Sequence, residues 1–165
     1  MSTKVGIGVD AHRFTEGRPL VLGGVEIDYH LGLAGHSDAD VLSHAIADSL
    51  LGAAGLEDIG HYFPDSDPAF ANISSLEIIK KAATLIETAG CKIGNIDAVL
   101  IAEEPLLAPY RSRIRESLSG ALAMAPADMS VRATTLEKMG FTGRGEGIAA
   151  IAVTLLECQN IRESG

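Results

Sequence analysis

Apolar residues recur along this chain with two spacings, one typical of strands and one typical of helices. Strands are expected at residues 4–10, 20–22, 25–27, 96–102, 130–135 and 147–157. Helices are expected from about 38 to 54, from 75 to 90 and from 109 to 124. We expect Ser37 or Asp38 to cap the first helix and Gly55 to end it, while Ser74 and Glu77 form a capping box for the second. Residues 56–73 are expected to be mostly irregular.

The order of these elements predicts an α+β fold, with a mixed β-sheet and its helices packed on one face. The last strand is apolar on both faces, so the uncovered face of the sheet would leave a large apolar patch on an isolated chain. We therefore expect an oligomer. The 165 residues contain no linker or repeat, which favours a single domain over 1–165.

Composition limits the kinds of ligand that the chain can bind. Apolar residues make up 47% and aromatic residues only 4%, so the core must be mainly aliphatic. The net charge of −9 argues against nucleic-acid binding, which needs a basic surface. That charge would also repel an anionic ligand at long range. A phosphate would then have to be held by metal ions, by backbone amides and by local cations such as Lys138 and Arg144.

The cysteines, the lengths of the apolar runs and the first residues of the chain bear on the compartment. Cys91 and Cys158 are the only cysteines and neither lies in a CxxC motif, so we expect neither a zinc ribbon nor a redox pair. No apolar run reaches 18 residues, so no membrane span is expected. Residues 1–4 lead directly into a strand, which predicts no targeting segment and a cytoplasmic protein.

The segment 132–147 combines hydroxyls, one carboxylate and a glycine-rich loop, with four glycines in its last eight residues. The hydroxyls of Thr134 and Thr135 and the free N–H groups of such a loop can hold phosphate oxygens. Glu137 offers a hard oxygen ligand to a divalent cation that bridges phosphates. The alternative for the two threonines is ordinary β propensity, which leaves the adjoining loop unexplained.

A candidate metal site involves the end of the first strand. Asp10 and His12 are two residues apart, so their side chains share one face of a strand. His44, from the first predicted helix, could complete a three-ligand set with an open fourth position, the pattern of a catalytic zinc site. The alternative is a strand-end aspartate with two hydrogen-bonded histidines, and spacing alone leaves both open.

Taken together, these segments resemble the 2-C-methyl-D-erythritol 2,4-cyclodiphosphate synthase family over essentially the whole chain. The motifs that carry the resemblance are residues 8–12, residues 34–40 with His44, residues 58–60, residues 63–68 and residues 132–147. The resemblance implies a homotrimer of α+β subunits whose other sheet faces lie toward the trimer core and whose active sites lie between subunits.

The implied reaction is an intramolecular phosphoryl transfer in the non-mevalonate (MEP) isoprenoid pathway. The 2-phosphate of 4-diphosphocytidyl-2-C-methyl-D-erythritol 2-phosphate attacks the β-phosphorus of its own diphosphate. CMP leaves and 2-C-methyl-D-erythritol 2,4-cyclodiphosphate remains, so the enzyme is a phosphorus–oxygen lyase. Because two anionic groups must be forced together, such catalysis depends mainly on positioning and charge neutralisation.

The resemblance also assigns roles to residues. Asp10, His12 and His44 would bind Zn²⁺, and Glu137 would bind a second cation, Mg²⁺ or Mn²⁺, that bridges the diphosphate. His36 and Thr135 would stabilise the transition state. The residues that would contact substrate are Asp10, His12, His36, Ser37, Asp58, Ile59, Gly60, Phe63, Pro64, Asp65, Ser66, Asp67, Ala102, Pro105, Leu106, Leu107, Ala108, Thr134, Thr135, Leu136 and Glu137.

Simpler interpretations stand beside two of these assignments. His36 and Ser37 could serve only at the start of a helix, and residues 58–67 could be an acidic turn without function. The chain also departs from the family pattern at two positions. Leu136 stands where a third threonine is often found. Leu106 stands where some members have lysine, so recognition of cytosine by 102–108 would depend on backbone groups.

Phe141 and Arg144 fall where the family's trimers line a central cavity that can hold an isoprenoid diphosphate. The alternative is that Phe141 belongs to the core and Arg144 pairs with Glu146. His30 and His61 match no motif and are expected to be solvated.

Two other functions remain open. A zinc-dependent hydrolase of a phosphorylated small molecule would use the same three ligands with water in the open position. A non-catalytic trimer that binds isoprenoid diphosphates would keep Phe141 and Arg144 but would not need the three ligands.

Overall fold

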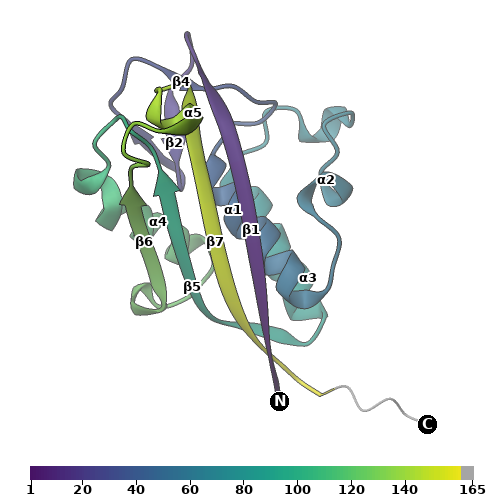
Figure 1. Ribbon diagram of the computed structural model, residues 1–165. Helices are drawn as coiled ribbons and strands as arrows, with labels where there is room; N and C mark the ends of the chain where they lie inside the picture. Colours follow the sequence, from purple (N-terminus) through teal and green to yellow (C-terminus); the bar gives the residue numbers. More distant parts are fainter. Residues whose placement is uncertain (161–165) are drawn as a thin grey trace.

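A five-stranded sheet runs the length of the molecule, and the computed structural model describes residues 1–160 around it (Figure 1). Its strands are β1 (Ser2–Thr15), β4 (Gly32–Leu33), β5 (Cys91–Ile101), β6 (Met129–Thr134) and β7 (Gly147–Cys158). The spatial order is β4-β1-β7-β5-β6, with β5 and β6 parallel and the other neighbours antiparallel. The predicted mixed sheet is confirmed. So is the predicted hairpin, formed by β2 (Leu20–Leu22) and β3 (Val25–Ile27).

Three helices of eleven or more residues cover one face of the sheet (Figure 1). They are α1 (Val41–Ala54), α3 (Ser75–Thr88) and α4 (Arg111–Ala121). Shorter helical segments are α2 (Ile59–Tyr62), α5 (Gly140–Gly143) and the 3₁₀ turns Pro68–Phe70, Ala108–Tyr110 and Pro126–Asp128. The α+β class with helices on one face is therefore confirmed.

Helix α1 lies unusually close to β1 because two inward-facing positions of that strand are glycines. A Cβ built on Gly8 would lie 1.9 Å from the carbonyl oxygen of Ala45. A Cβ on Gly6 would lie 2.1 Å from the carbonyl oxygen of Ser49. The missing side chains let the backbone of α1 rest on the strand, and this places His44 next to Asp10.

The N-cap of α1 was predicted wrongly. The cap is Asp40, not Ser37 or Asp38, because Ala39 takes the left-handed conformation (φ 55°) and turns the chain just before the helix. The buried Asp40 carboxylate accepts hydrogen bonds from the N–H groups of Ser43 (3.1 Å), Gly23 (2.9 Å) and Gly24 (2.8 Å). Asp40 thus ties the β2–β3 hairpin to the start of α1. The predicted end of α1 at Gly55, which is also left-handed, is confirmed.

Other boundaries moved by a few residues. Strand β5 begins five residues before the predicted strand at 96, because a β-bulge between Ile93 and Asn95 accommodates Gly94 without ending the strand. The predicted cap Ser74 accepts a hydrogen bond from the Leu76 N–H (3.3 Å) at the start of α3. The core between sheet and helices is aliphatic, as composition predicted. Its largest fully buried side chains are Leu20, Leu22, Ile27, Leu33, Leu42, Ile46, Leu50, Leu51, Ile79, Ile86, Ile96 and Leu100.

The face of the sheet away from the helices carries an apolar band. On β1 the side chains of Val5, Ile7 and Val9 are 61–65% exposed. The register places Leu155, Val153 and Ile151 of β7 directly beside them. Neighbouring side chains on one face of a sheet form a continuous surface. This chain alone therefore presents an apolar sheet face of the kind that marks a protein interface.

The sequence did not predict that the two cysteines form a disulfide bond. Cys91 at the start of β5 and Cys158 at the end of β7 lie opposite each other in the register and form a disulfide bond. They are 67 residues apart in the sequence, so no local motif marks them. Within residues 1–160, no helix combines the length and apolar character needed to cross a membrane.

Candidate functional site

Three predicted metal ligands converge at the end of β1. Asp10 Oδ2 lies 2.8 Å from His12 Nε2 and 3.1 Å from His44 Nδ1. The two imidazole nitrogens lie 3.3 Å apart. Asp10 and His12 share the inward face of β1, as their spacing predicted, and His44 reaches them from the first turn of α1. The three ligand atoms thus form a compact triangle suited to a metal ion.

A residue outside the triangle determines which ring nitrogen of His12 carries a proton. Its Nδ1 lies 2.8 Å from the carbonyl oxygen of Ala34, which can only accept a hydrogen bond. Nδ1 therefore carries a proton, and Nε2 is the nitrogen that faces Asp10 and His44; it donates to Asp10 when the ring is positively charged and offers its lone pair when the ring is neutral. A ring nitrogen fixed in this way by an outer partner is typical of metal-bound histidines.

The electrostatics of the cluster reflect a half-buried carboxylate between two imidazoles. Burial alone would raise the pKa of the Asp10 carboxyl, but its hydrogen bonds with His12 and His44 lower it from 3.8 to about 2. Burial alone would lower the pKa of His12, whereas its hydrogen bond with Asp10 raises it above 6.5. A negative carboxylate thus draws positive charge to this point, whether a proton or a metal ion.

The triangle opens into a cavity of about 470 Å³ between β1, α1 and the segment after α2. The predicted residues that line it are Asp10, His12, His36, Ser37, His44, Ile59, Gly60, Phe63, Pro64 and Asp65. Asp48 also lines it and was missed in the sequence, although it stands one helical turn after His44. Burial raises the pKa of the Asp48 carboxyl, which accepts a hydrogen bond from the Ile59 N–H (3.0 Å).

Within residues 58–67, three of the predicted substrate residues do not line this cavity. Asp58 accepts a hydrogen bond from the His61 N–H (3.0 Å) and caps α2. Asp67 accepts one from the Ala69 N–H (2.9 Å) and caps the next 3₁₀ turn. Ser66 lies between them in an exposed turn. In this structure the two aspartates have the simple turn role that the sequence left open.

The backbone of the loop that carries His36 is held by hydrogen bonds, whereas the His36 side chain is exposed. The Arg18 guanidinium donates hydrogen bonds to the carbonyl oxygens of Gly35 and Ser37, on either side of His36. The His36 side chain is 76% exposed, with Nε2 3.9 Å from the Asp65 carboxylate across the cavity mouth. The backbone is therefore fixed and the imidazole is accessible to a ligand.

The remaining predicted residues gather around a second cavity of about 150 Å³ at the ends of β5 and β6. Those that line it are Ala102, Pro105, Leu106, Leu107, Ala108, Thr134 and Thr135. Leu136 and Glu137 follow as exposed residues, and Glu137 and Lys138 both have positive φ angles of 54° and 61°. The turn exposes the Glu137 carboxylate beyond the end of the sheet.

One chain does not bring the two groups of residues into one cavity. The register places Asp10 level with Ala150, Leu100 and Ala133 on four successive strands. Three interstrand steps separate the two ends of this row by about 14 Å, at about 4.8 Å per step. Both groups lie at the end of the sheet where β5 and β6 finish (Figure 1), but on opposite edges.

Comparison with known proteins identifies the family. The sequence profile of the YgbB family matches residues 3–157. The chain belongs to this family. The matched segment contains both cavities and every predicted site residue from Asp10 to Arg144.

Individual relatives match the chain over nearly their whole length. A protein named 2-C-methyl-D-erythritol 2,4-cyclodiphosphate synthase from Syntrophobacter fumaroxidans is 54% identical over 153 residues, 93% of this chain and 96% of that protein. One of the same name from Rubrobacter xylanophilus is 55% identical over 157 residues, 93% of this chain and 94% of that protein.

Solved structures agree with the fold. IspF of Plasmodium falciparum in complex with CDP has a TM-score of 0.84 at 34% identity, covering 96% of this chain and 98% of that chain. The bifunctional IspDF of Campylobacter jejuni has a TM-score of 0.92 at 40% identity. This chain is matched over 96% of its length there but spans only 43% of the Campylobacter protein.

Three further predictions for this chain concern residues outside the two cavities that hold the candidate site. The Arg144 guanidinium lies 3.1 Å from the Glu146 carboxylate, so the alternative prediction of an ion pair is confirmed. Phe141, on α5, is 40% exposed and does not belong to the core. His30 and His61 are exposed, as expected.

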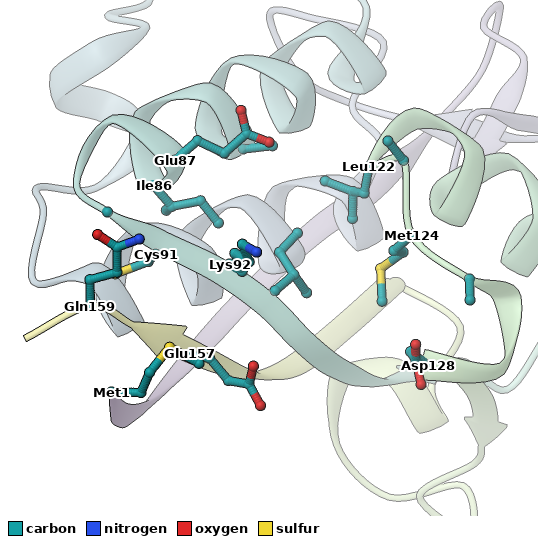
Figure 2. A pocket seen from close by; sticks show the side chains of 15 residues that line it. Met1, Ile86, Glu87, Cys91, Lys92, Leu122, Met124, Asp128, Glu157 and Gln159 are labelled. Atoms are coloured by element: carbon teal, nitrogen blue, oxygen red, sulfur yellow. The ribbon is translucent and has the colours of Figure 1, made fainter.

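A cavity of about 520 Å³ lies at the opposite end of the sheet, between the end of α3, the start of β5 and the loop after α4 (Figure 2). Its lining includes Glu87, Lys92, Met124 and the disulfide-bonded Cys91, and it contains none of the predicted site residues. The candidate chemistry is therefore confined to the end of the sheet that carries Asp10.

Proposed function

We propose that this chain converts 4-diphosphocytidyl-2-C-methyl-D-erythritol 2-phosphate to 2-C-methyl-D-erythritol 2,4-cyclodiphosphate and CMP, as a phosphorus–oxygen lyase of the non-mevalonate isoprenoid pathway. The observation that carries this proposal is the triangle of Asp10, His12 and His44 beside an open cavity. It lies in a chain more than half identical to proteins named for that product.

Asp10, His12 and His44 would hold Zn²⁺. Their ligand atoms are 2.8–3.3 Å apart. Ligands at about 2.0–2.1 Å from a tetrahedral ion would be about 3.3 Å apart, so the triangle would need to widen only slightly to hold it. Two nitrogens and one carboxylate oxygen leave the fourth position open. When bound, the ion would supply a Lewis acid that neutralises charge on the diphosphate.

Glu137 would hold the second cation, Mg²⁺ or Mn²⁺, that bridges the diphosphate. Its exposed carboxylate follows Thr134 and Thr135, whose hydroxyls and backbone amides would bind phosphate oxygens. We assign transition-state stabilisation to Thr135 and to the accessible His36. Both can donate hydrogen bonds to the phosphoryl oxygens on which charge develops.

The remaining substrate contacts are divided between the two cavities. Ser37 and residues 58–67 would surround the ribose and methylerythritol portions, and residues 102–108 would surround the cytosine. In the reaction an oxygen of the 2-phosphate forms a bond to the β-phosphorus. The bond from the β-phosphorus to the bridging oxygen breaks, and that oxygen leaves on CMP. The protein's task is to hold the two anionic groups in line.

We propose that the functional form is a homotrimer in which two chains complete each site. The two cavities are separated across the sheet of one chain, and the apolar band of Val5, Ile7 and Val9 requires a partner. A ring of three chains would bury the bands at its centre and place the metal triangle of one chain against Thr135 of the next.

Two smaller proposals follow the family resemblance. The central cavity of such a trimer would hold an isoprenoid diphosphate near Phe141 and Arg144, with Arg144 leaving its ion pair with Glu146 for the ligand. The proposed compartment is the cytoplasm.

Phosphorus NMR of the purified protein with the proposed substrate, zinc and magnesium tests the function. Two coupled diphosphate resonances of a cyclic product, with one CMP per product, are expected. CMP with an opened phosphate product would instead indicate the zinc-dependent hydrolase. Absence of turnover in the metal-loaded protein would favour the non-catalytic binding protein.

A further inference from the structure

We propose that Asp38 and Ser75 are positioning residues for His44, which hold its ring so that Nδ1 faces the metal position. This inference rests on the proposed function only in assigning a metal to the triangle. The three residues come from different elements: Asp38 from the loop before α1, His44 from α1, and Ser75 from the start of α3.

Ser75 directs both of its donors at one carboxylate. Its backbone N–H donates to Asp38 Oδ2 at 3.1 Å, and its hydroxyl donates to Asp38 Oδ1. Ser75 is fully buried, so no solvent competes for these hydrogen bonds. A carboxylate can only accept, which fixes the direction of the Ser75 hydroxyl proton.

The direction of that proton determines the tautomer of His44. Ser75 Oγ lies 2.9 Å from His44 Nε2. Because the Ser75 proton points to Asp38, the oxygen must accept from the ring, and Nε2 must carry a hydrogen. The other ring nitrogen, Nδ1, then faces Asp10 Oδ2 at 3.1 Å, where it donates a hydrogen bond when the ring is positively charged and presents its lone pair when the ring is neutral. Asp38 therefore acts on the triangle through Ser75.

The two histidines of the triangle are thus oriented in the same way by different partners. His12 donates from Nδ1 to the Ala34 carbonyl, and His44 donates from Nε2 to Ser75. Each ring turns its other nitrogen inward, toward the metal position. Outer partners of this kind set ligand orientation, and their loss typically lowers metal affinity by about 10–100-fold.

Ser37 is a second neighbour of the same ring nitrogen, and it does not replace Ser75. Its Oγ lies 3.2 Å from His44 Nε2 and already accepts a hydrogen bond from the Ala39 N–H at 3.2 Å. Ser75 is both closer and more deeply buried. Ser75 can therefore hold the ring while Ser37 turns to a ligand in the cavity.

The first test is the His44 tautomer in zinc-free Asp10→Ala protein, which lacks the carboxylate that competes for a proton on Nδ1, observed by two-bond ¹⁵N–¹H correlation spectra of the imidazoles. The spectra are recorded at about pH 9, above the ordinary imidazole pKa of about 6.5. We expect a protonated Nε2 and a bare Nδ1 on His44. A proton on Nδ1 in this variant would overturn the proposal.

The second test is zinc affinity, measured by competition with a chromophoric chelator. Ser75→Ala and Asp38→Asn should each bind zinc about 10–100-fold more weakly than wild type. Ser74→Ala is the matched control, because it removes a neighbouring hydroxyl that caps α3 without contacting His44. We expect its affinity to stay within about twofold of wild type, below the 10–100-fold loss typical of outer partners. Unchanged affinity in folded Ser75→Ala would contradict the proposal.

Both readouts are independent of turnover. If the tautomer and the zinc affinities are as expected but the wild-type protein releases no CMP, the proposed reaction is wrong and this inference still holds. If the wild-type protein cyclises the substrate normally but folded Ser75→Ala binds zinc with unchanged affinity, this inference is wrong and the proposed reaction still holds.

Discussion

Gly8 of β1 faces Ala45 of α1 so closely that a Cβ on the glycine would lie 1.9 Å from the Ala45 carbonyl oxygen. Ala45 directly follows His44, so the contact that brings helix to strand also sets the position of a proposed metal ligand. Packing and chemistry therefore depend on the same glycine.

Gly8→Ala should destabilise the protein and weaken zinc binding together. The new methyl group must push α1 away from β1, and overpacking of this kind costs about 1–3 kcal/mol. Gly52→Ala is the control, because a Cβ there lies 3.9 Å from its nearest neighbour and replaces glycine within a helix. It should be neutral or stabilising by up to about 1 kcal/mol. Denaturant unfolding and chelator competition measure the two effects.

The lowered pKa of Asp10 predicts how the stability of the metal-free protein depends on pH. Since the pKa falls from 3.8 to about 2 on folding, the ionised carboxylate stabilises the fold above about pH 4. That contribution, roughly 2 kcal/mol, should be lost as the pH falls from 4 toward 2. The stability difference between wild type and Asp10→Asn should shrink over this range. A difference that stays constant would show that Asp10 is not held as an ion.

The disulfide between Cys91 and Cys158 should stabilise the chain by closing a loop of 67 residues. Loop-closure entropy for this length corresponds to about 4 kcal/mol. The double variant Cys91→Ser with Cys158→Ser should therefore unfold at lower denaturant concentration than the oxidised wild type. In reducing agent the two proteins should become similar. Two free thiols in the unreduced wild type, counted by alkylation and intact mass, would contradict the bond.

The apolar band should hold the proposed trimer together. Ile7→Asp places a charge in the middle of the band, where burial against another chain would be costly. We expect monomers by light scattering, with helical content retained and cyclisation lost. Thr84→Asp, on the exposed side of α3, should remain trimeric. A monomeric wild type with full activity would rule out the shared site.

The sequence predicted the features that depend on local periodicity. The hairpin around Gly23 and Gly24 and the closing strand were placed within a residue because their apolar patterns are short and clearly bounded. Asp10 and His12 were correctly placed on one face because strand geometry fixes alternate side chains.

Features that depend on tertiary contacts were not predictable in this way. The Asp40 cap depends on a left-handed Ala39 and on the hairpin that docks beside it. The pairing of Cys91 with Cys158 requires β5 beside β7. Ser75 was expected only at the start of a helix, and its contact with His44 exists because α3 packs against α1. The division of the candidate site into two cavities follows from the strand order alone.

The central claim, that two chains complete each site, is tested most directly by subunit complementation. His44→Ala and Thr135→Ala chains with different affinity tags are co-expressed, and trimers that carry both tags are purified and assayed for CMP release. Each homotrimer should be inactive. In a closed ring of three, every mixed trimer contains one site with an intact His44 facing an intact Thr135, so about one third of wild-type activity should return. No recovery in mixed trimers would place both halves of the site in the same chain and contradict the account.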